Sequence, residues 1–218
     1  MNDGDIHRVM GLLAEAVKAW PSPAVTIVSQ WDGDPFKVLV SCILSLRTQD
    51  RTTGPASERL FALAATPKAM LRLTPEMIEK AIYPVGFYRN KAAQILAISR
   101  TLVEDHGGKV PDDVEALLAF KGVGRKTANL VVTLGFGKPG ICVDTHVHRI
   151  CNRWGYVKTR TPEKTEFALR DKLPVEYWLV INDELVTYGQ NICTPLSPRC
   201  SICTLAVFCD RLGVDRSR

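Results

Sequence analysis

The chain has 218 residues, of which 46% are hydrophobic and 23% are charged, as is ordinary for a soluble globular enzyme that buries a core without disulfides. Its formal net charge of +5 suits a polyanionic partner without requiring one. The longest apolar stretches, such as FKVLVSCILSL, are too short and too interrupted to span a bilayer, so we expect no membrane partner.

The N-terminus carries the acids Asp3 and Asp5 and continues with helical periodicity, unlike a signal peptide with a basic start and an unbroken apolar stretch. We therefore expect a cytoplasmic protein, associated with the nucleoid if the source is a prokaryote. In that reducing setting, the seven cysteines are expected to be thiols or metal ligands.

Helical signals follow one another along the chain. The first runs over 5–20, where an apolar stripe ends at Pro21, and a second, apolar nearly all round, starts near Pro35 and covers 34–50. Thr74 and Pro75 mark a helix start, and Gly107-Gly108 close a long helix. The remaining predicted helices cover residues 56–65, 74–82, 89–108, 112–120, 124–137, 144–155, 162–173 and 175–193.

Strand signals are weak, because the only strand-like run, at 139–143, is short and is expected to be a connector. The sequence therefore predicts an all-α fold. After Cys193, prolines and cysteines replace the helical pattern, so residues 193–209 are expected to form a loop held by something other than a core.

The stretch KGVGRKTANLVV, residues 121–132, has the pattern of a tight Gly-x-Gly turn that leads into a helix. Such a turn points backbone N–H groups outward at a helix start, where the helix dipole favours an anion such as phosphate. Lys121 and Arg125 flank the turn and add positive charge. Most Gly-containing turns bind nothing, so the turn alone leaves both interpretations open.

Lys126 and Asp144 are candidate catalytic residues. A lysine attacks only as the neutral amine, which burial, a neighbouring cation and the positive end of a helix all favour. Asp144 follows a short apolar run and is typical of a helix N-cap, yet a capping carboxylate can also carry protons. The pair suits an amine nucleophile with an acid–base partner.

KGVGRKTANLVV followed by VDTHVHRICNR resembles the helix-hairpin-helix and Gly-Pro-Asp loop of the endonuclease III family of DNA glycosylases. The resemblance extends through PFKVLVSCILSLRTQD, VGFYRNKAAQI and the cysteines. It implies that Lys126 is a Schiff-base nucleophile assisted by Asp144. It also implies two helical domains, a helical barrel of residues 28–138 and an iron–sulfur cluster domain of residues 1–27 with 139–218, and a monomer acting on double-stranded DNA with damaged bases or abasic sites.

Cys193, Cys200, Cys203 and Cys209 are close together in sequence, with no histidine among them, and four such thiolates are typical of a metal site. The spacing alone leaves zinc and iron–sulfur open. The resemblance implies a [4Fe-4S] cluster that ties the loop. The other three cysteines lie in apolar contexts and are expected to be buried structural thiols: Cys42, Cys142 and Cys151.

The resemblance also implies a set of DNA contacts. The chain has Arg47 where many members have Gln, Phe87 where many have Leu, and Lys121 where the family usually has Pro. Phe87 could stack on an orphaned base and Arg47 could donate hydrogen bonds to it. The expected DNA-contacting residues are Arg47, Phe87, Lys121, Gly122, Val123, Gly124, Arg125, His146 and Arg199.

His146 and His148 form an H-x-H pair, but at helical spacing the two rings point to different faces, so we expect no metal there. The favoured function is a bifunctional DNA N-glycosylase and abasic-site lyase that removes oxidised pyrimidines. Two alternatives stay open: a monofunctional adenine or uracil glycosylase that uses Asp144 and water, and a non-catalytic DNA-binding or redox-sensing cluster protein.

Overall fold

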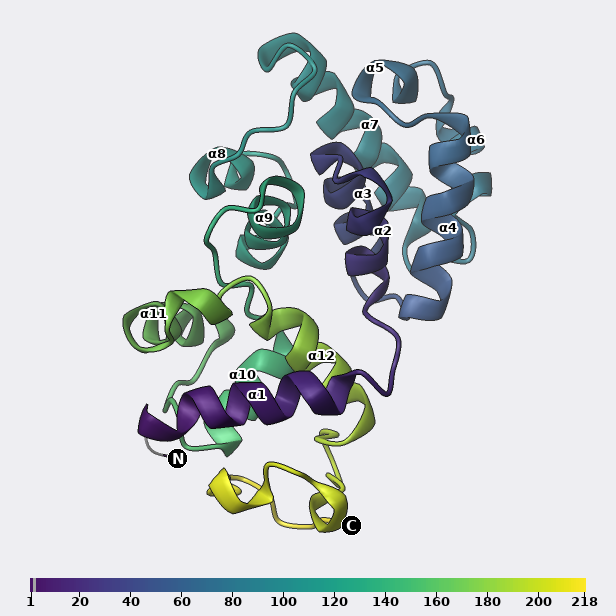
Figure 1. The fold of residues 1–218 in the computed structure, drawn as a ribbon. Coiled ribbons are helices and arrows are strands. Elements are labelled where there is room, and N and C mark those ends of the chain that lie inside the picture. Colours follow the sequence, from purple (N-terminus) through teal and green to yellow (C-terminus); the bar gives the residue numbers. More distant parts are fainter. Residues whose placement is uncertain (2) are drawn as a thin grey trace. The chain divides into compact units, whose positions relative to one another are not determined.

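A computed structural model describes Met1 and residues 3–218, and within them the chain is helical with no β-strand, as predicted. The chain divides into two compact units. One comprises residues 24–140, and the other comprises residues 1–23 and 141–218 (Figure 1). In the described part of the chain, no helix is long and apolar enough to cross a membrane.

The unit of residues 24–140 is built around one buried helix, α3, which begins after the N-cap Asp34 and carries eight buried residues. It packs against α2, α4, α7, α9 and the π-helical segment η2. The elements of this unit are α2 (Ala24–Asp32), α3 (Pro35–Ser45), α4 (Asp50–Leu63), α5 (Pro67–Met70), α6 (Pro75–Ile82), α7 (Tyr88–Asp105), α8 (Val114–Leu118), α9 (Arg125–Leu130) and η2 (Val131–Gly135).

The other unit joins the N-terminal helix to the last third of the chain, as Figure 1 shows for α1 beside α12. Its core combines the predicted stripe of α1, buried at Ile6, Val9, Met10 and Leu13, with apolar residues of the later helices. Its elements are η1 (Asp3–Asp5), α1 (Ile6–Val17), α10 (Thr145–Arg153), α11 (Pro162–Lys172), η3 (Val175–Tyr177), α12 (Ile181–Asn191), η4 (Cys200–Ile202) and η5 (Ala206–Phe208).

Some helix bounds differ from those predicted. The helix expected over 34–50 ends at Ser45, because Arg47 has a left-handed backbone (φ 52°), and α4 already begins at Asp50. The helix expected over 175–193 is split into η3 and α12. The helix α2 was not predicted, and residues 139–143 form a connector without regular structure, as expected.

Candidate functional site

The hairpin turn between α8 and α9, residues 119–124, is anchored by two apolar side chains. Phe120 and Val123 are buried, and the Val123 N–H donates to the Phe120 carbonyl at 3.0 Å. Gly122 between them has φ 79°, a left-handed conformation that favours glycine. Lys121, Gly122 and Gly124 are exposed, so the turn presents its backbone and one cation, while Val123 contributes only backbone.

The same turn is braced by α7. Gln94 Nε2 donates to the Lys121 carbonyl at 3.1 Å. A Cβ placed on Gly122 would lie 2.5 Å from that Nε2 atom, so the Gln94 side chain would have to shift and its hydrogen bond to the turn would be disturbed. Arg125, half-buried, forms an ion pair with Glu115 of α8, with Nη1 and Oε1 3.4 Å apart. The hairpin is therefore held from both sides.

Lys126 lies in the first turn of α9 and is partly exposed. Burial raises the pKa of Cys42, on α3, to about 12, and the positive charge of Lys126 acts in the opposite direction on the same thiol. The Lys126 ammonium therefore lies near Cys42. The packing of α9 against α3 thus sets the position of the candidate nucleophile.

Asp144 belongs to the other unit and is the N-cap of α10, as predicted. Its Oδ1 atom accepts hydrogen bonds from the N–H groups of His146 (2.8 Å) and Val147 (3.0 Å), and the residue is 8% exposed. One carboxylate oxygen thus holds the helix start, so the side chain has a fixed orientation.

The two histidines of α10 make different contacts. His146 Nδ1 lies 3.1 Å from Arg149 Nη2, and both side chains occupy the space that a Cβ on Gly189 would need. His148 Nδ1 instead lies 2.7 Å from Thr165 Oγ1, and burial lowers the pKa of His148. Within the part of the chain that the structure describes, no metal-binding group contains either ring.

Arg47 and Phe87 lie together in the unit of residues 24–140. Both are exposed, and the Arg47 guanidinium carbon is 5.7 Å from the centre of the Phe87 ring. Both residues have left-handed backbones, with φ 52° at Arg47 and 58° at Phe87. Phe87 is 60% exposed, so its ring is not part of the core.

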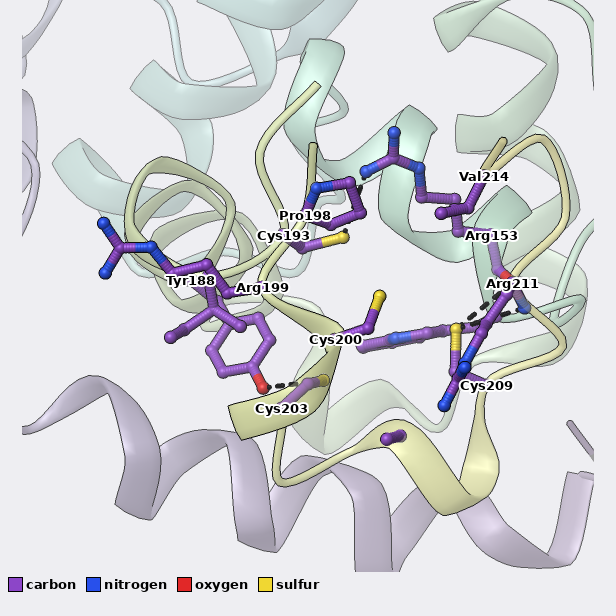
Figure 2. Close-up of a pocket in the computed structure, with 13 residues that line it drawn as sticks. Arg153, Tyr188, Cys193, Pro198, Arg199, Cys200, Cys203, Cys209, Arg211 and Val214 are labelled. Atoms are coloured by element: carbon purple, nitrogen blue, oxygen red, sulfur yellow. Dashed lines mark hydrogen bonds between the residues drawn. The ribbon is translucent and has the colours of Figure 1, made fainter. Parts of the chain in front are cut away.

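The four clustered cysteines line one cavity (Figure 2). Its remaining walls include apolar side chains, among them Trp154, Ile192 and Val214. The thiols are close enough to interact, because burial raises the pKa of Cys209 and the other three cysteines add to that effect. As placed, no three His, Cys, Asp or Glu side chains of the described residues form a group that could hold a single metal ion.

Three polar groups contact the sulfurs of this cavity (Figure 2). Arg153 Nη1 donates to Cys193 Sγ at 3.3 Å, Tyr188 Oη lies 3.2 Å from Cys203 Sγ, and the Arg211 N–H donates to Cys209 Sγ at 3.4 Å. Such donors stabilise thiolates, so the environment fits a site that binds metal through deprotonated cysteines.

Two arginines of α10, neither of them predicted, hold the start of the cysteine loop. Arg149 donates to the carbonyls of Gly189 and Cys193, and Arg153 donates to those of Thr194 and Pro195. Their i, i+4 spacing, which places both on one helix face, was the available signal. Arg199, by contrast, is exposed. The other three cysteines are buried, as predicted: Cys42, Cys142 and Cys151.

Comparison with known proteins gives one consistent result. Residues 40–175 match the family model described as HhH-GPD superfamily base excision DNA repair protein. The chain is 48% identical over 199 residues to endonuclease III of Thermotoga maritima, and the match covers 91% of each chain.

Solved structures agree with the sequence comparison. A non-covalent endonuclease III–DNA complex superposes with a TM-score of 0.85 at 30% identity, covering 97% of this chain and 96% of the other. A trapped covalent endonuclease III–DNA intermediate gives a TM-score of 0.83 at 30% identity, covering 97% of each chain. The all-helical fold is therefore shared with proteins solved on DNA.

Proposed function

The chain belongs to the HhH-GPD superfamily of base excision DNA repair proteins, and within it to the endonuclease III family. We propose that it is a bifunctional DNA glycosylase and abasic-site lyase that removes oxidised pyrimidines from double-stranded DNA. The observation that carries this proposal is the position of Lys126, a partly exposed lysine in the first helical turn after a braced Gly-Val-Gly turn. It stands in a chain 48% identical to an endonuclease III.

Lys126 is the proposed nucleophile. Its neutral amine attacks C1′ of the damaged nucleotide, a C–N bond forms as the glycosidic bond breaks, and the base leaves with its electron pair and takes up a proton. The amine loses a proton and the sugar opens to a Schiff base. Loss of a proton from C2′ then expels the 3′ phosphate by β-elimination, and water releases the lysine.

Asp144 is the proposed acid–base partner. Its carboxylate is oriented by the two N–H groups of α10 that Oδ1 accepts. The oxygen Oδ2 can exchange protons with the reacting groups while the other oxygen keeps the helix capped. This fixed orientation of the carboxylate supports the proposed role.

The hairpin and the exposed cations are the proposed DNA contacts. The backbone of residues 122–124, with Lys121 and Arg125, would bind phosphate oxygens, which position a protein on DNA without reading its sequence. Arg47 and Phe87 would enter the duplex at the extruded nucleotide. His146 and Arg199 complete the proposed set. The protein is proposed to act as a monomer. Its proposed domains are a helical barrel of residues 28–138 and a cluster domain formed by residues 1–27 together with residues 139–218.

The four cysteines are the proposed ligands of a [4Fe-4S] cluster: Cys193, Cys200, Cys203 and Cys209. In such a cluster each thiolate binds a different iron, so the sulfurs surround the site without meeting at one ion. The cavity has all four thiols on its walls together with apolar residues, which supports this assignment. When bound, the cluster supplies a cross-link for a loop that lacks its own core.

Borohydride trapping tests the proposal. Cluster-loaded protein is incubated with duplexes that carry an oxidised pyrimidine or a plain abasic site, and borohydride is added to reduce any Schiff base. We expect a covalent adduct with both duplexes. The variant Lys126→Gln is expected to fold and to bind DNA but to form no adduct, a loss of at least about 1,000-fold in rate.

The outcomes separate the alternatives. Base release without an adduct would replace this proposal with a monofunctional glycosylase that uses Asp144 and water. Neither base release nor an adduct from folded, cluster-loaded protein would favour a non-catalytic DNA-binding protein. An adduct that persists in Lys126→Gln would mean that another amine is the nucleophile.

A further inference from the structure

Lys91 of α7 is a buried lysine that the proposed mechanism does not use. It is 5% exposed, and its Nζ atom donates to the carbonyls of Leu44 (2.9 Å) and Leu46 (2.6 Å) and to Thr48 Oγ1 (3.2 Å). Among the described residues, no carboxylate pairs with it. Burial lowers the pKa of Lys91 to about 8, so keeping an ammonium here is unfavourable. The three N–H donors of the Lys91 ammonium are therefore all used on the segment of residues 44–48.

Two of these acceptors belong to the C-terminal end of α3, where helix carbonyls lack partners within the helix and attract a cation. A helix cap alone would account for them. The third acceptor, Thr48, does more, because its hydroxyl oxygen also accepts from the Gly86 N–H at 3.2 Å. Thr48 therefore links the turn after α3 to the turn before α7, and Lys91 holds that link in place.

The two linked turns present the exposed pair Arg47 and Phe87. Arg47 lies between Leu46 and Thr48, and Phe87 directly follows Gly86. The turns touch backbone to backbone, since a Cβ on Gly86 would lie 2.7 Å from the Arg47 carbonyl oxygen. The Lys91 N–H also donates to the Phe87 carbonyl at 3.0 Å. Lys91 thus holds both members of the pair.

The pair is held in an unfavourable conformation. Left-handed backbone is unfavourable at a residue with a side chain and persists only where the surroundings impose it. Here it occurs at both Arg47 and Phe87, and the result is a guanidinium over an aromatic ring in solvent. Burying the Lys91 ammonium to maintain an exposed contact between Arg47 and Phe87 adds little to the stability of the fold. The exposed guanidinium and ring instead form a preformed surface on which a planar group, such as a nucleic-acid base, can stack.

We propose that Lys91 is a positioning residue for opening the DNA duplex: it clamps the turns of residues 46–48 and 86–87 so that Arg47 and Phe87 are presented as one preformed stack. The stack fills the gap left by the extruded nucleotide and meets the orphaned base, with the ring as a stacking face and the guanidinium as hydrogen-bond donor. This inference rests on the proposed function, since it needs an enzyme that extrudes a nucleotide.

The test compares two substrates under single-turnover conditions. In one, the oxidised pyrimidine lies opposite a normal base. In the other, it lies opposite an abasic analogue, so that no orphaned base remains and opening costs less. Lys91→Met keeps the length and volume of the side chain but removes the cation. Arg100→Met is the matched control, because it removes an exposed cation from the same helix.

We expect Lys91→Met to slow excision opposite a normal base by roughly 10- to 100-fold, as a misplacement of about 1 Å does. Opposite the abasic analogue, the loss should be no more than about threefold, and Arg100→Met should match wild type on both substrates. Thr48→Val, which removes the linking hydroxyl and leaves Lys91 in place, should show the same dependence on the opposite base. It serves as the test if Lys91→Met does not fold.

Equal losses on both substrates would assign Lys91 a purely structural role and overturn the inference. So would wild-type rates for folded Lys91→Met or Thr48→Val while the wild-type enzyme is active. A wild-type protein that excises neither lesion and forms no adduct would overturn the proposed function itself, and the inference with it.

Discussion

The hairpin turn of residues 119–124 and the cysteine loop of residues 193–209 are both short segments without long helices, yet they are held in different ways. The hairpin buries Phe120 and Val123 and makes its turn at a glycine. The loop leaves Leu196 93% exposed and Val207 86% exposed. Its start is held by hydrogen bonds from α10 and its thiols surround a cavity.

This difference shows what each segment depends on. Apolar burial supports the hairpin continuously, because the hydrophobic effect requires no bound group. The loop buries Leu205 but leaves Ile202 exposed along with Leu196 and Val207, so its shape depends largely on polar contacts and on whatever joins the four sulfurs. Perturbing the hairpin should therefore have graded effects, whereas removing one thiol should release the whole loop.

Cys203→Ser should have the largest effect, and it should act on the cysteine loop but not on the hairpin turn. Without one of the four proposed ligands, the proposed cluster should be lost and the amide hydrogens of residues 193–209 should exchange at least about 1,000-fold faster, a loss of about 4 kcal/mol of local stability. Residues 119–124 should keep their protection. Hydrogen exchange followed by mass spectrometry measures the protection of the two segments, and metal analysis measures the iron content. Cys151→Ala, which removes a buried thiol outside the loop, should keep its iron; equal iron loss there would contradict the assignment of ligands.

Arg153→Met should have the next largest effect. Arg153 is only 7% exposed, and its guanidinium donates to Cys193 Sγ and to the carbonyls of Thr194 and Pro195. The change removes these donors. Leaving these acceptors unpaired should lower the free energy of unfolding by about 3 kcal/mol, measured by denaturant titration of the loaded protein. Arg160→Met removes an exposed cation of the same unit and should change it little. Similar values for the two variants would mean that the loop does not depend on Arg153.

Gly122→Ala should have the smallest effect, and it tests the hairpin turn. The new Cβ would meet Gln94 Nε2 in a left-handed backbone, so the free energy of unfolding should fall by about 1–2 kcal/mol. Gly124→Ala is the matched control, because φ there is −99° and no atom lies within 4 Å of the added Cβ. Thermal unfolding compares the two. A larger loss for Gly124→Ala would contradict this account of the turn.

Much of the fold follows from local patterns. Periodicity predicted α1 and α7, and side-chain caps predicted the starts of α6 at Thr74 and of α10 at Asp144, because a cap depends only on residues two or three positions away. The helix α2 escaped notice because its Val, Thr and Ile residues are weak helix formers. It forms because α3 and α4 pack against it.

The features of the candidate site also fall into two groups, those that follow from local sequence patterns and those that depend on tertiary contacts. The sequence by itself determined the helical class, the Gly-x-Gly turn with its lysine and the spacing of the four cysteines, because each is a pattern within about twenty residues. Only the tertiary structure decided that Lys91 reaches the end of α3, that Arg47 lies over Phe87, and that Arg153 reaches a cysteine forty residues later. These contacts join distant segments, and chain packing, which no local pattern encodes, brings them together.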